Sequence, residues 1–286
     1  MATTPNVYQI ITDRIVALIE AGTVPWQQPW HSEQGEVRNL LTETPYRGIN
    51  VWMLGSAGYA SPFWLTYNQA KAQGGHVRQG EKGYPIVFLK NYVGIDKDTG
   101  DEEKRFVLKY YTVFNSLQCE DITTPTLDTP AHHFTPIEIC EKLVGNMPQK
   151  PAILHGSSQA FYRPSQDAVH MPDPTAFERR EAYYSTLFHE LTHSTGHADR
   201  LNRATLKDMV RFGDANYSKE ELVAEMGATY LCGVCGIENA TITNSAAYLN
   251  GWLSALRHDN KLLIQAAAQA QKAADFIRNL SQEAHE

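Results

Sequence analysis

The chain has 286 residues, of which 42% are hydrophobic and 20% are charged, and its net charge at pH 7 is −7. This composition is typical of a folded soluble protein and excludes wholesale disorder and a collagen-like repeat. It also excludes a membrane span, because no stretch approaches the roughly 18 consecutive apolar residues that a span requires. The length suggests one large domain or two of ordinary size, at about 150 residues each.

The beginning of the chain carries charges that a secretory signal peptide lacks. Asp13, Arg14 and Glu20 interrupt every apolar run there. The cysteines are too few and too irregularly spaced for a disulfide framework in a chain of this length. They are Cys119, Cys140, Cys232 and Cys235. We therefore expect a cytoplasmic protein in a reducing compartment.

The first part of the chain predicts three helices followed by a long β-hairpin. Apolar residues recur at helical spacing from Tyr8 to Leu18, between a start signal at Thr4 and a stop at Gly22. Two later runs, rich in β-branched and aromatic residues, flank a polar turn around Gly100, as the strands of a hairpin do. The elements expected after the first helix are helices around Asn50 to Leu54 and Thr66 to Gln73, and strands at Tyr84 to Val93 and Arg105 to Phe114.

A proline-rich segment divides the chain into two expected domains. Between Asp121 and Pro136, three prolines each follow a threonine, and apolar periodicity is absent. We therefore expect one domain at residues 1–125, a linker at 126–136 and a second domain at 137–286. The second domain predicts a helix near Ile137 to Val144, three short strands, and almost continuous helix from about Thr175 onward. Both domains are expected to be α+β, the second mostly helical.

The most specific pattern is the HExxH motif that runs from His189 to His193 inside a helical pattern. Residues four apart lie on one face of a helix, so both imidazoles reach a single zinc ion. Glu190 lies beside them as the general base that takes a proton from water activated by the metal, and later as the acid toward the leaving amine. The predicted strand from Ala168 to Met171 precedes the motif, where a zinc peptidase has its substrate-binding edge strand.

A catalytic zinc needs a third protein ligand and one open position. Glu221 and Glu225 lie four apart on a later predicted helix, and their E-x-x-A-E spacing resembles the second-helix motif of thermolysin-like zinc peptidases. We predict Glu221 as the ligand, and Glu225 as the residue that orients a ligating histidine or as the alternative ligand. Two alternatives stay open: Glu221 could close a capping box with Ser218, and His197 could be the third ligand if the first helix continued past Gly196.

Zinc is the expected cofactor, although histidine and carboxylate ligands also suit manganese and cobalt. Cys232 and Cys235 form a C-x-x-C pair, but no second pair completes a zinc knuckle. We expect these two cysteines to be buried on their helix.

Cations and aromatic residues alternate in the first domain. Between Asn39 and Lys90 there are five positive and only two negative residues, interleaved with tyrosine, tryptophan and phenylalanine, in an otherwise acidic chain. Single-stranded nucleic acid is bound by this combination, phosphates by Lys and Arg and unpaired bases by aromatic faces. The same aromatic positions are also typical of a core, so composition alone leaves nucleic-acid binding open.

Longer stretches resemble a known family. ITDRIVALIEAGTVPWQQPW, PYRGINVWML, FWLTYNQAKAQGGHVRQGEKG and YTVFN are similar to the amino-terminal single-stranded-DNA-binding domain of the ArdC family of plasmid antirestriction proteins. YYSTLFHELTHSTGH, RLNR, YSKEELVAEMGATYL and AAYLNGWLSAL resemble the zincin-like metallopeptidase domain of the same family. The resemblance covers nearly the whole chain apart from the linker and the ends.

The resemblance implies a cytoplasmic protein that binds single-stranded DNA and helps a conjugating plasmid to evade restriction in the cell it enters. His189, Glu190 and His193 carry over directly to the peptidase site. The candidate DNA contacts are the residues that fall in the motifs of the family's DNA-binding domain: Arg47, Asn50, Trp64, Gln69, Arg78 and Lys82. The expected partners are single-stranded DNA and a protein substrate, either a restriction component or a DNA-bound protein, and no membrane.

Two hypotheses follow for the mechanism. In the first, the protein is a DNA-dependent peptidase and requires Glu190. In the second, it coats single-stranded DNA while the metal only stabilises the second domain, so that loss of Glu190 is tolerated. The sequence favours the first, since a structural zinc usually has four protein ligands and needs no glutamate beside its histidines. A role beside plasmid replication proteins is a third reading, although no primase motif is visible.

Overall fold

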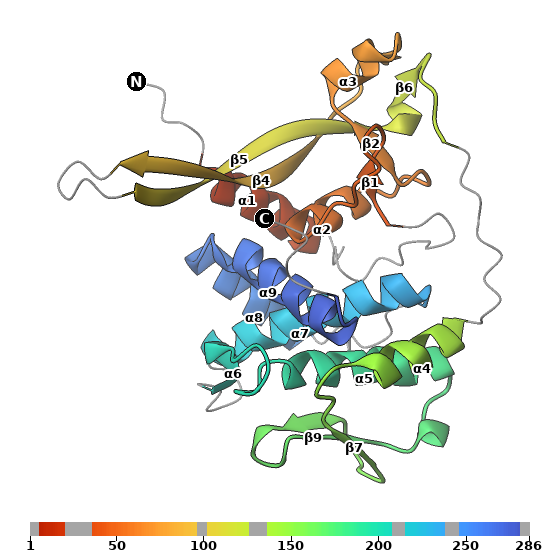
Figure 1. Ribbon diagram of the computed structural model, residues 1–286, viewed down its shortest axis with the longest axis vertical. Coiled ribbons are helices and arrows are strands. Elements are labelled where there is room, and N and C mark those ends of the chain that lie inside the picture. Colours follow the sequence, from red (N-terminus) through yellow and green to blue (C-terminus); the bar gives the residue numbers. More distant parts are fainter. Residues whose placement is uncertain are drawn as a thin grey trace.

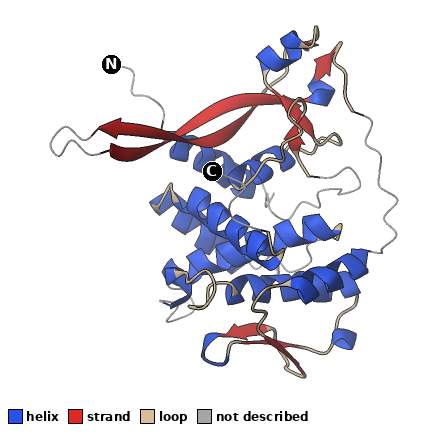
Figure 2. Cartoon of the chain, in the orientation of Figure 1, coloured by secondary structure: helices blue, strands red, loops and turns tan. Residues whose placement is uncertain are grey.

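The computed structural model describes residues 6–20, 36–95, 102–125, 136–207, 215–237 and 246–280. A bundle of helices lies in the middle of the molecule (Figure 1), with a long ribbon of two strands on one side and a small sheet on the other (Figure 2). The fold is therefore mixed α and β, as the sequence predicts. Among the described residues, no helix combines the length and the apolar character needed to cross a membrane.

Helix α1 (Val7–Glu20) opens the described part of the chain and turns one apolar face inward. Three isoleucines spaced by four residues are buried on that face, which confirms the amphipathic helix predicted from the sequence. The predicted start at Thr4 and stop at Gly22 lie outside the described residues.

Strands β4 (Tyr84–Ile95) and β5 (Glu102–Asn115) confirm the predicted hairpin, whose turn lies outside the described residues. They belong to a four-stranded sheet of order β1-β2-β5-β4, in which β1 is Arg38–Asn39 and β2 is Phe63–Leu65. The two short helices predicted in this half, α2 and α3, are also confirmed. The remaining elements here are β1 (Arg38–Asn39), α2 (Ile49–Gly55), β2 (Phe63–Leu65), α3 (Tyr67–Ala72), β3 (His76–Val77) and β6 (Cys119–Glu120).

The second half begins with α4 (Pro136–Asn146), which confirms the helix predicted after the proline-rich segment. Most of that segment, residues 126–135, lies outside the described residues, so the domain limits stay a prediction. The elements that follow are β7 (Ala152–His155), β8 (Phe161–Arg163), β9 (Ala168–Met171), α5 (Arg180–Ser194), α6 (Ala204–Lys207), α7 (Ala215–Cys235), α8 (Ala246–His258) and α9 (Leu262–Ile277).

The prediction that Ala168 to Met171 forms an edge strand was wrong. This strand, β9, is the central one of a three-stranded sheet of order β7-β9-β8, parallel to β7 and antiparallel to β8. Both of its backbone edges are therefore occupied, and an extended peptide cannot add to it as a further strand. Val169 and Met171 are fully buried, which explains why the run reads as a strand without revealing its position in the sheet.

The prediction of almost continuous helix from about Thr175 was also wrong. Thr175 lies in a 3-10 turn that begins at Pro174, and α5 begins only at Arg180. Helix α5 ends at Ser194, the chain then turns, and Asn202 adopts a left-handed backbone conformation with φ of 52°, which a right-handed helix does not contain. These breaks matter because they allow α5 and α7 to pack side by side.

Helices from both halves of the chain share one hydrophobic core. The ring of Trp52 on α2 is fully buried, and its centroid lies 4.6 Å from that of Tyr230 on α7. The Tyr230 hydroxyl donates to the carbonyl of Gly48 (2.7 Å), whose N–H donates to the Gln271 side chain on α9 (3.2 Å). Thr12 on α1 donates to the carbonyl of Asn260 (3.0 Å). The first half is therefore held to the second by packing as well as by chain connection.

This shared core predicts the effect of removing its central ring. Trp52→Ala should lower the free energy of unfolding by about 3–5 kcal/mol, the usual cost of deleting a buried aromatic side chain. Urea unfolding followed by circular dichroism measures it. Tyr67→Ala is the control, because Tyr67 is 55% exposed, and its effect should stay within about 0.5 kcal/mol. Equal losses in the two variants would contradict the shared core.

Candidate metal centre

The two histidines of the HExxH motif face a common point. Both lie in the last turns of α5, four residues apart, and their Nε2 atoms are separated by 3.1 Å. His193 and Glu190 are buried, and the side chain of His189 is 13% exposed. The imidazoles are thus already arranged side by side within the helix packing.

Glu221 on α7 completes this arrangement. One of its oxygens lies 3.5 Å from Nε2 of His189, and the other lies 3.5 Å from Nε2 of His193. A tetrahedral ion with ligand bonds of about 2.1 Å holds its ligand atoms about 3.4 Å apart. The three side chains therefore fit a divalent metal, and in the described part of the chain they are the one cluster of three such groups within 4.8 Å of one another.

Two more carboxylates of α7 lie behind the imidazoles. Glu225 Oε1 is 3.3 Å from Nδ1 of His189, and Glu220 Oε1 is 3.3 Å from Nδ1 of His193. A carboxylate on the far ring nitrogen fixes the tautomer and orientation of a ligating histidine. Glu225 lies where the sequence predicts an orienting residue, whereas Glu220 was not predicted.

Attraction between opposite charges shifts the pKa values of the buried histidine and glutamate side chains and keeps them charged. Burial lowers the pKa of His193, but hydrogen bonds to Glu220 and Glu221 outweigh it and raise the pKa to about 9. Burial raises the pKa of Glu220, but His193 and Arg203 outweigh it and lower the pKa to about 2. The pKa of Glu221 is likewise lowered against burial by the two histidines. The carboxylates of Glu220 and Glu221 are therefore ionised at neutral pH, and a cation that binds here replaces protons on the imidazoles.

Arg203 fixes Glu220 in place. It is buried, donates to both Glu220 oxygens, and also donates to the carbonyl of Thr192 on α5 (2.8 Å). The segment after α5 is thus tied to both metal-bearing helices. Removing one partner of a buried ion pair costs about 3–5 kcal/mol, because the other charge is left unpaired. Sequence spacing gives no signal for this pair, which forms across a loop.

The close approach of α5 and α7 depends on a glycine. A Cβ atom at Gly227 would lie 2.5 Å from Cγ2 and 2.6 Å from Oγ1 of Thr192. Such distances are far below van der Waals contact, so any larger residue pushes the helices apart. Gly227 lies on α7 six residues beyond Glu221, and Thr192 directly precedes His193 on α5.

The alternatives left open by the sequence do not fit this geometry. Helix α7 begins at Ala215, so Ser218 lies inside the helix and not at the position before it that a capping box requires. His197 lies beyond the end of α5, where its Nδ1 accepts the N–H of Asp199 (3.3 Å), outside the cluster. Cys232 and Cys235 are buried and unpaired, as expected.

Comparison with known proteins assigns both halves of the chain. Residues 5–114 match the N-terminal domain of anti-restriction factor ArdC, and residues 140–269 match a zincin-like metallopeptidase domain. A crystal structure of the antirestriction protein ArdC from plasmid R388 has 38% sequence identity and a TM-score of 0.77, over 97% of this chain and 100% of that one. The chain belongs to the ArdC antirestriction family.

Two other relatives show how this unit is used elsewhere. An uncharacterized protein of Sinorhizobium fredii, y4eC, is 35% identical over 96% of this chain and 92% of its own length. The DNA primase TraC of Escherichia coli is 35% identical over 94% of this chain, which spans only 27% of the primase. The family's two-domain unit thus occurs both as most of a protein and as part of a longer one.

A divalent metal is consistent with this family. The R388 protein was also solved in a Mn(II)-bound form, with 37% identity and a TM-score of 0.76 over 98% of this chain. The zincin-like domain match covers all three side chains of the cluster. Both observations point to a divalent ion without selecting zinc.

Two of the six candidate DNA contacts are buried. The Asn50 amide donates to the carbonyl of Val87 (2.8 Å) and accepts its N–H (2.7 Å), so it joins α2 to strand β4. Trp64 packs edge-on against Tyr59 and Tyr84 with centroids 5.6 and 5.3 Å away. Neither side chain is exposed to a DNA strand in this structure.

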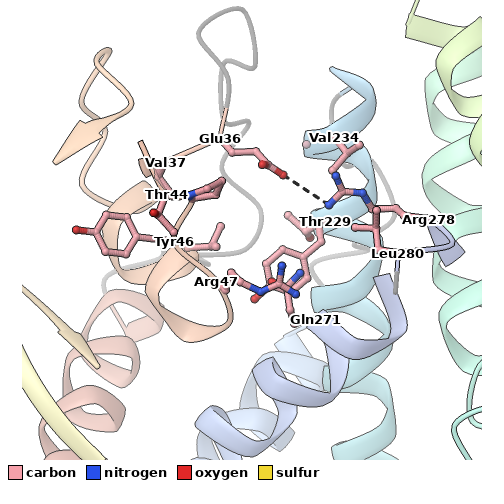
Figure 3. A pocket seen from close by; sticks show the side chains of 14 residues that line it. Glu36, Val37, Thr44, Tyr46, Arg47, Thr229, Val234, Gln271, Arg278 and Leu280 are labelled. Carbon is pink, nitrogen blue, oxygen red and sulfur yellow. Dashed lines mark ion pairs between the residues drawn. The ribbon is translucent and has the colours of Figure 1, made fainter. Parts of the chain in front are cut away.

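Arg47 lies at the junction of the two halves. It forms an ion pair with Asp275 on α9, and it lines a pocket of about 280 Å³ between the segment before α2 and helices α7 and α9 (Figure 3). Arg278 and Glu36, 3.7 Å apart, lie on the other side of that pocket. Arg47 therefore contributes to the contact between domains.

The other three candidates lie near the short helix α3 and the start of β4. The Gln69 side chain accepts the N–H of Thr66 (2.8 Å) and completes the capping box of α3. Arg78 is exposed and paired with Glu81 (2.8 Å), and Lys82 is exposed. The six candidates therefore do not form one exposed surface, and their contact with DNA stays a prediction.

The geometry predicts different effects for the two candidate carboxylate ligands. Glu225→Gln should weaken metal affinity about 10–100-fold, the usual effect of losing an orienting partner. Glu221→Gln should weaken it further, because a neutral amide is a poor ligand. Calorimetric titration of the metal-stripped protein with Mn²⁺ and with Zn²⁺ measures both. Glu178→Gln, at an exposed position, is the control, and a larger effect of Glu225→Gln would make Glu225 the ligand.

The helix contact predicts a steric effect at Gly227. Gly227→Ala should lower the free energy of unfolding by about 1–3 kcal/mol and weaken metal binding, because it moves α7 away from α5. Thr192→Ala in the same chain should restore both, since it removes the two atoms nearest to the new methyl group. Gly251→Ala on α8 is the matched control: its Cβ meets no atom within 4 Å, so it should be neutral or stabilise by up to about 1 kcal/mol. Thermal unfolding and metal content measure these effects.

Proposed function

We propose that this protein is a zinc-dependent peptidase coupled to single-stranded-DNA binding, and that it protects incoming plasmid DNA from restriction in the recipient cell. The observation that carries the proposal is the convergence of His189, His193 and Glu221, with a buried glutamate, Glu190, between the two histidines in the sequence of α5. The ArdC family and its zincin-like domain supply the biological setting.

The ligand set supports a catalytic site. Within the described residues the cluster offers three ligands, whereas a structural zinc is usually held by four protein side chains. When bound, a divalent metal supplies Lewis-acid chemistry, which polarises an amide carbonyl and makes water more acidic. His189, His193 and Glu221 would hold the ion, and Glu225 and Glu220, each 3.3 Å from the far ring nitrogen of one histidine, would orient the two rings.

Glu190 performs the proton transfers in this proposal. It lies between the two histidines in sequence, on the same helix, and its charge contributes to the raised pKa of His189. As general base it takes a proton from the attacking water, and as general acid it gives the proton to the departing amine. Burial of the carboxylate keeps competing bulk water away from it.

The second candidate function is coating of single-stranded DNA without hydrolysis. The specific observation in its favour is the network of buried charges around the cluster, because a metal bound there would also stabilise the contact between α5 and α7. Under this alternative, the metal ligands are required and Glu190 is not.

Glu190→Gln separates the two functions. If the protein is a peptidase, the variant should retain metal and DNA binding, lose about 10²–10⁴-fold in hydrolysis, and no longer protect a transferred plasmid. Transfer efficiency into restricting and non-restricting recipients measures protection, and Glu178→Gln is the matched control. Full protection by Glu190→Gln would mean that binding suffices.

A further inference from the structure

One face of the β4–β5 hairpin is left open in its outer part. Cross-strand partners in an antiparallel pair lie on the same face, and the register pairs Phe88 with Lys109 and Ile86 with Tyr111. Ile86 is buried under the first domain's aromatic cluster, whereas Phe88 and Tyr111 are 48% and 44% exposed. The exposed part of this face therefore begins between Ile86, which the aromatic cluster covers, and Phe88, which it leaves exposed.

A groove of about 410 Å³ follows this face. Its floor is the sheet, and its end wall comes from β1 and from the cap of α3. The lining residues are Asn39, Tyr46, Thr66, Gln69, Ile86, Phe88, Lys90, Lys109 and Tyr111. Two of them are exposed lysines and none is acidic, although the whole chain has a net charge of −7. The charged side chains that line the groove are thus both cationic, the type of side chain that contacts the phosphates of a nucleic acid.

Its two aromatic rings are arranged for stacking. The centroids of Phe88 and Tyr111 are 5.8 Å apart, with an angle of 68° between the ring planes. In a T-shaped contact the edge of one ring lies on one face of the other, so each ring keeps at least one face that its partner does not cover. A base with a free face can stack on such a ring at a gain of about 1–3 kcal/mol.

We infer that this groove is the binding site for single-stranded DNA, with bases on Phe88 and Tyr111 and phosphates beside Lys90 and Lys109. The inference rests on the single-stranded-DNA binding proposed above and names the surface that performs it. A duplex does not fit this mode, because its bases are already stacked on one another and present only their edges.

The polar groups at the end of the groove argue for binding without sequence preference. Gln69 Oε1 accepts the N–H of Thr66 (2.8 Å), and Asn39 Oδ1 accepts the N–H groups of Leu41 and Thr42 (3.0 and 3.1 Å). Both amide oxygens are thus already used by the local backbone. They shape the end of the groove rather than read base edges, and recognition depends on stacking and charge.

The test measures binding of the full chain to a fluorescein-labelled oligothymidine of about 16 nucleotides by fluorescence anisotropy. Phe88→Ala and Tyr111→Ala should each weaken binding by about 5-fold to 150-fold, and Tyr111→Phe should retain it. Lys90→Gln and Lys109→Gln should each lower the slope of log affinity against log salt by about 0.7. Unchanged metal content and thermal unfolding verify that each variant folds.

Tyr110→Ala is the matched control, since Tyr110 is 44% exposed, lies next to Tyr111 and points to the opposite face. It should change affinity by less than about twofold. If wild type binds and Tyr110→Ala weakens binding as much as Tyr111→Ala, the groove is overturned while DNA binding stands. Equal affinity for a duplex of the same length overturns the stacking mode. If the wild type does not bind the oligonucleotide at all, the proposed DNA binding itself fails.

Discussion

The structure of the metal centre depends on the close packing of α5 against α7. Gly227 leaves room for Thr192, so the two helices approach until a methyl group would no longer fit between them. At that separation Glu221 reaches both imidazoles, while Glu220 and Glu225 reach their far nitrogens. A wider spacing would separate the two buried imidazoles from the carboxylates of Glu221 and Glu225, at a cost of several kcal/mol for each buried charge left without a partner. The close contact of α5 with α7 therefore allows the ion pairs to form, and the ion pairs in turn stabilise the contact.

Helix α7 also connects the metal centre with the first domain. Its Tyr230 packs on Trp52 and donates to Gly48, and the Thr229 hydroxyl donates to the carbonyl of Glu225 (3.0 Å). Tyr230, which touches the first domain, thus lies on the same helix only five residues beyond Glu225, which contacts His189. Arg47 adds an ion pair with Asp275 at the same junction. One rigid helix therefore belongs to both the site and the contact between domains.

The local features of the site could be predicted from the sequence, and the features formed across loops could not. His189 and His193 are four residues apart on one helix, so their shared face follows from helix geometry alone. Glu221 and Glu225 follow from the same spacing on a second helix. The ion pair of Arg203 and Glu220 joins a loop to a helix. Its spacing in the sequence follows neither a helical nor a strand period, so the sequence does not predict it.

Aromatic and polar residues of the first domain show a second limit of sequence reasoning. Trp64 and Phe88 belong to the same aromatic-rich segment of the sequence, which does not distinguish core from surface positions. In the structure, Trp64 packs between two tyrosines, whereas Phe88 lies on an exposed face of the sheet. The difference depends on strand pairing: Trp64 on β2 pairs with Asn115, whereas Phe88 on β4 pairs with Lys109. The edge strand was mispredicted for a related reason: order within a sheet is set by pairing and not by the strand's own residues.

The shared core explains how relatives reuse this unit. The primase TraC matches 94% of this chain although the match spans only 27% of its own length, so both domains occur together there. Separating them would expose the buried faces of α1 and α2, which pack against α8 and α9. At about 25 cal/mol per Å² of apolar surface, that exposure is costly for either half. In this chain, the two domains therefore stabilise each other through their shared core.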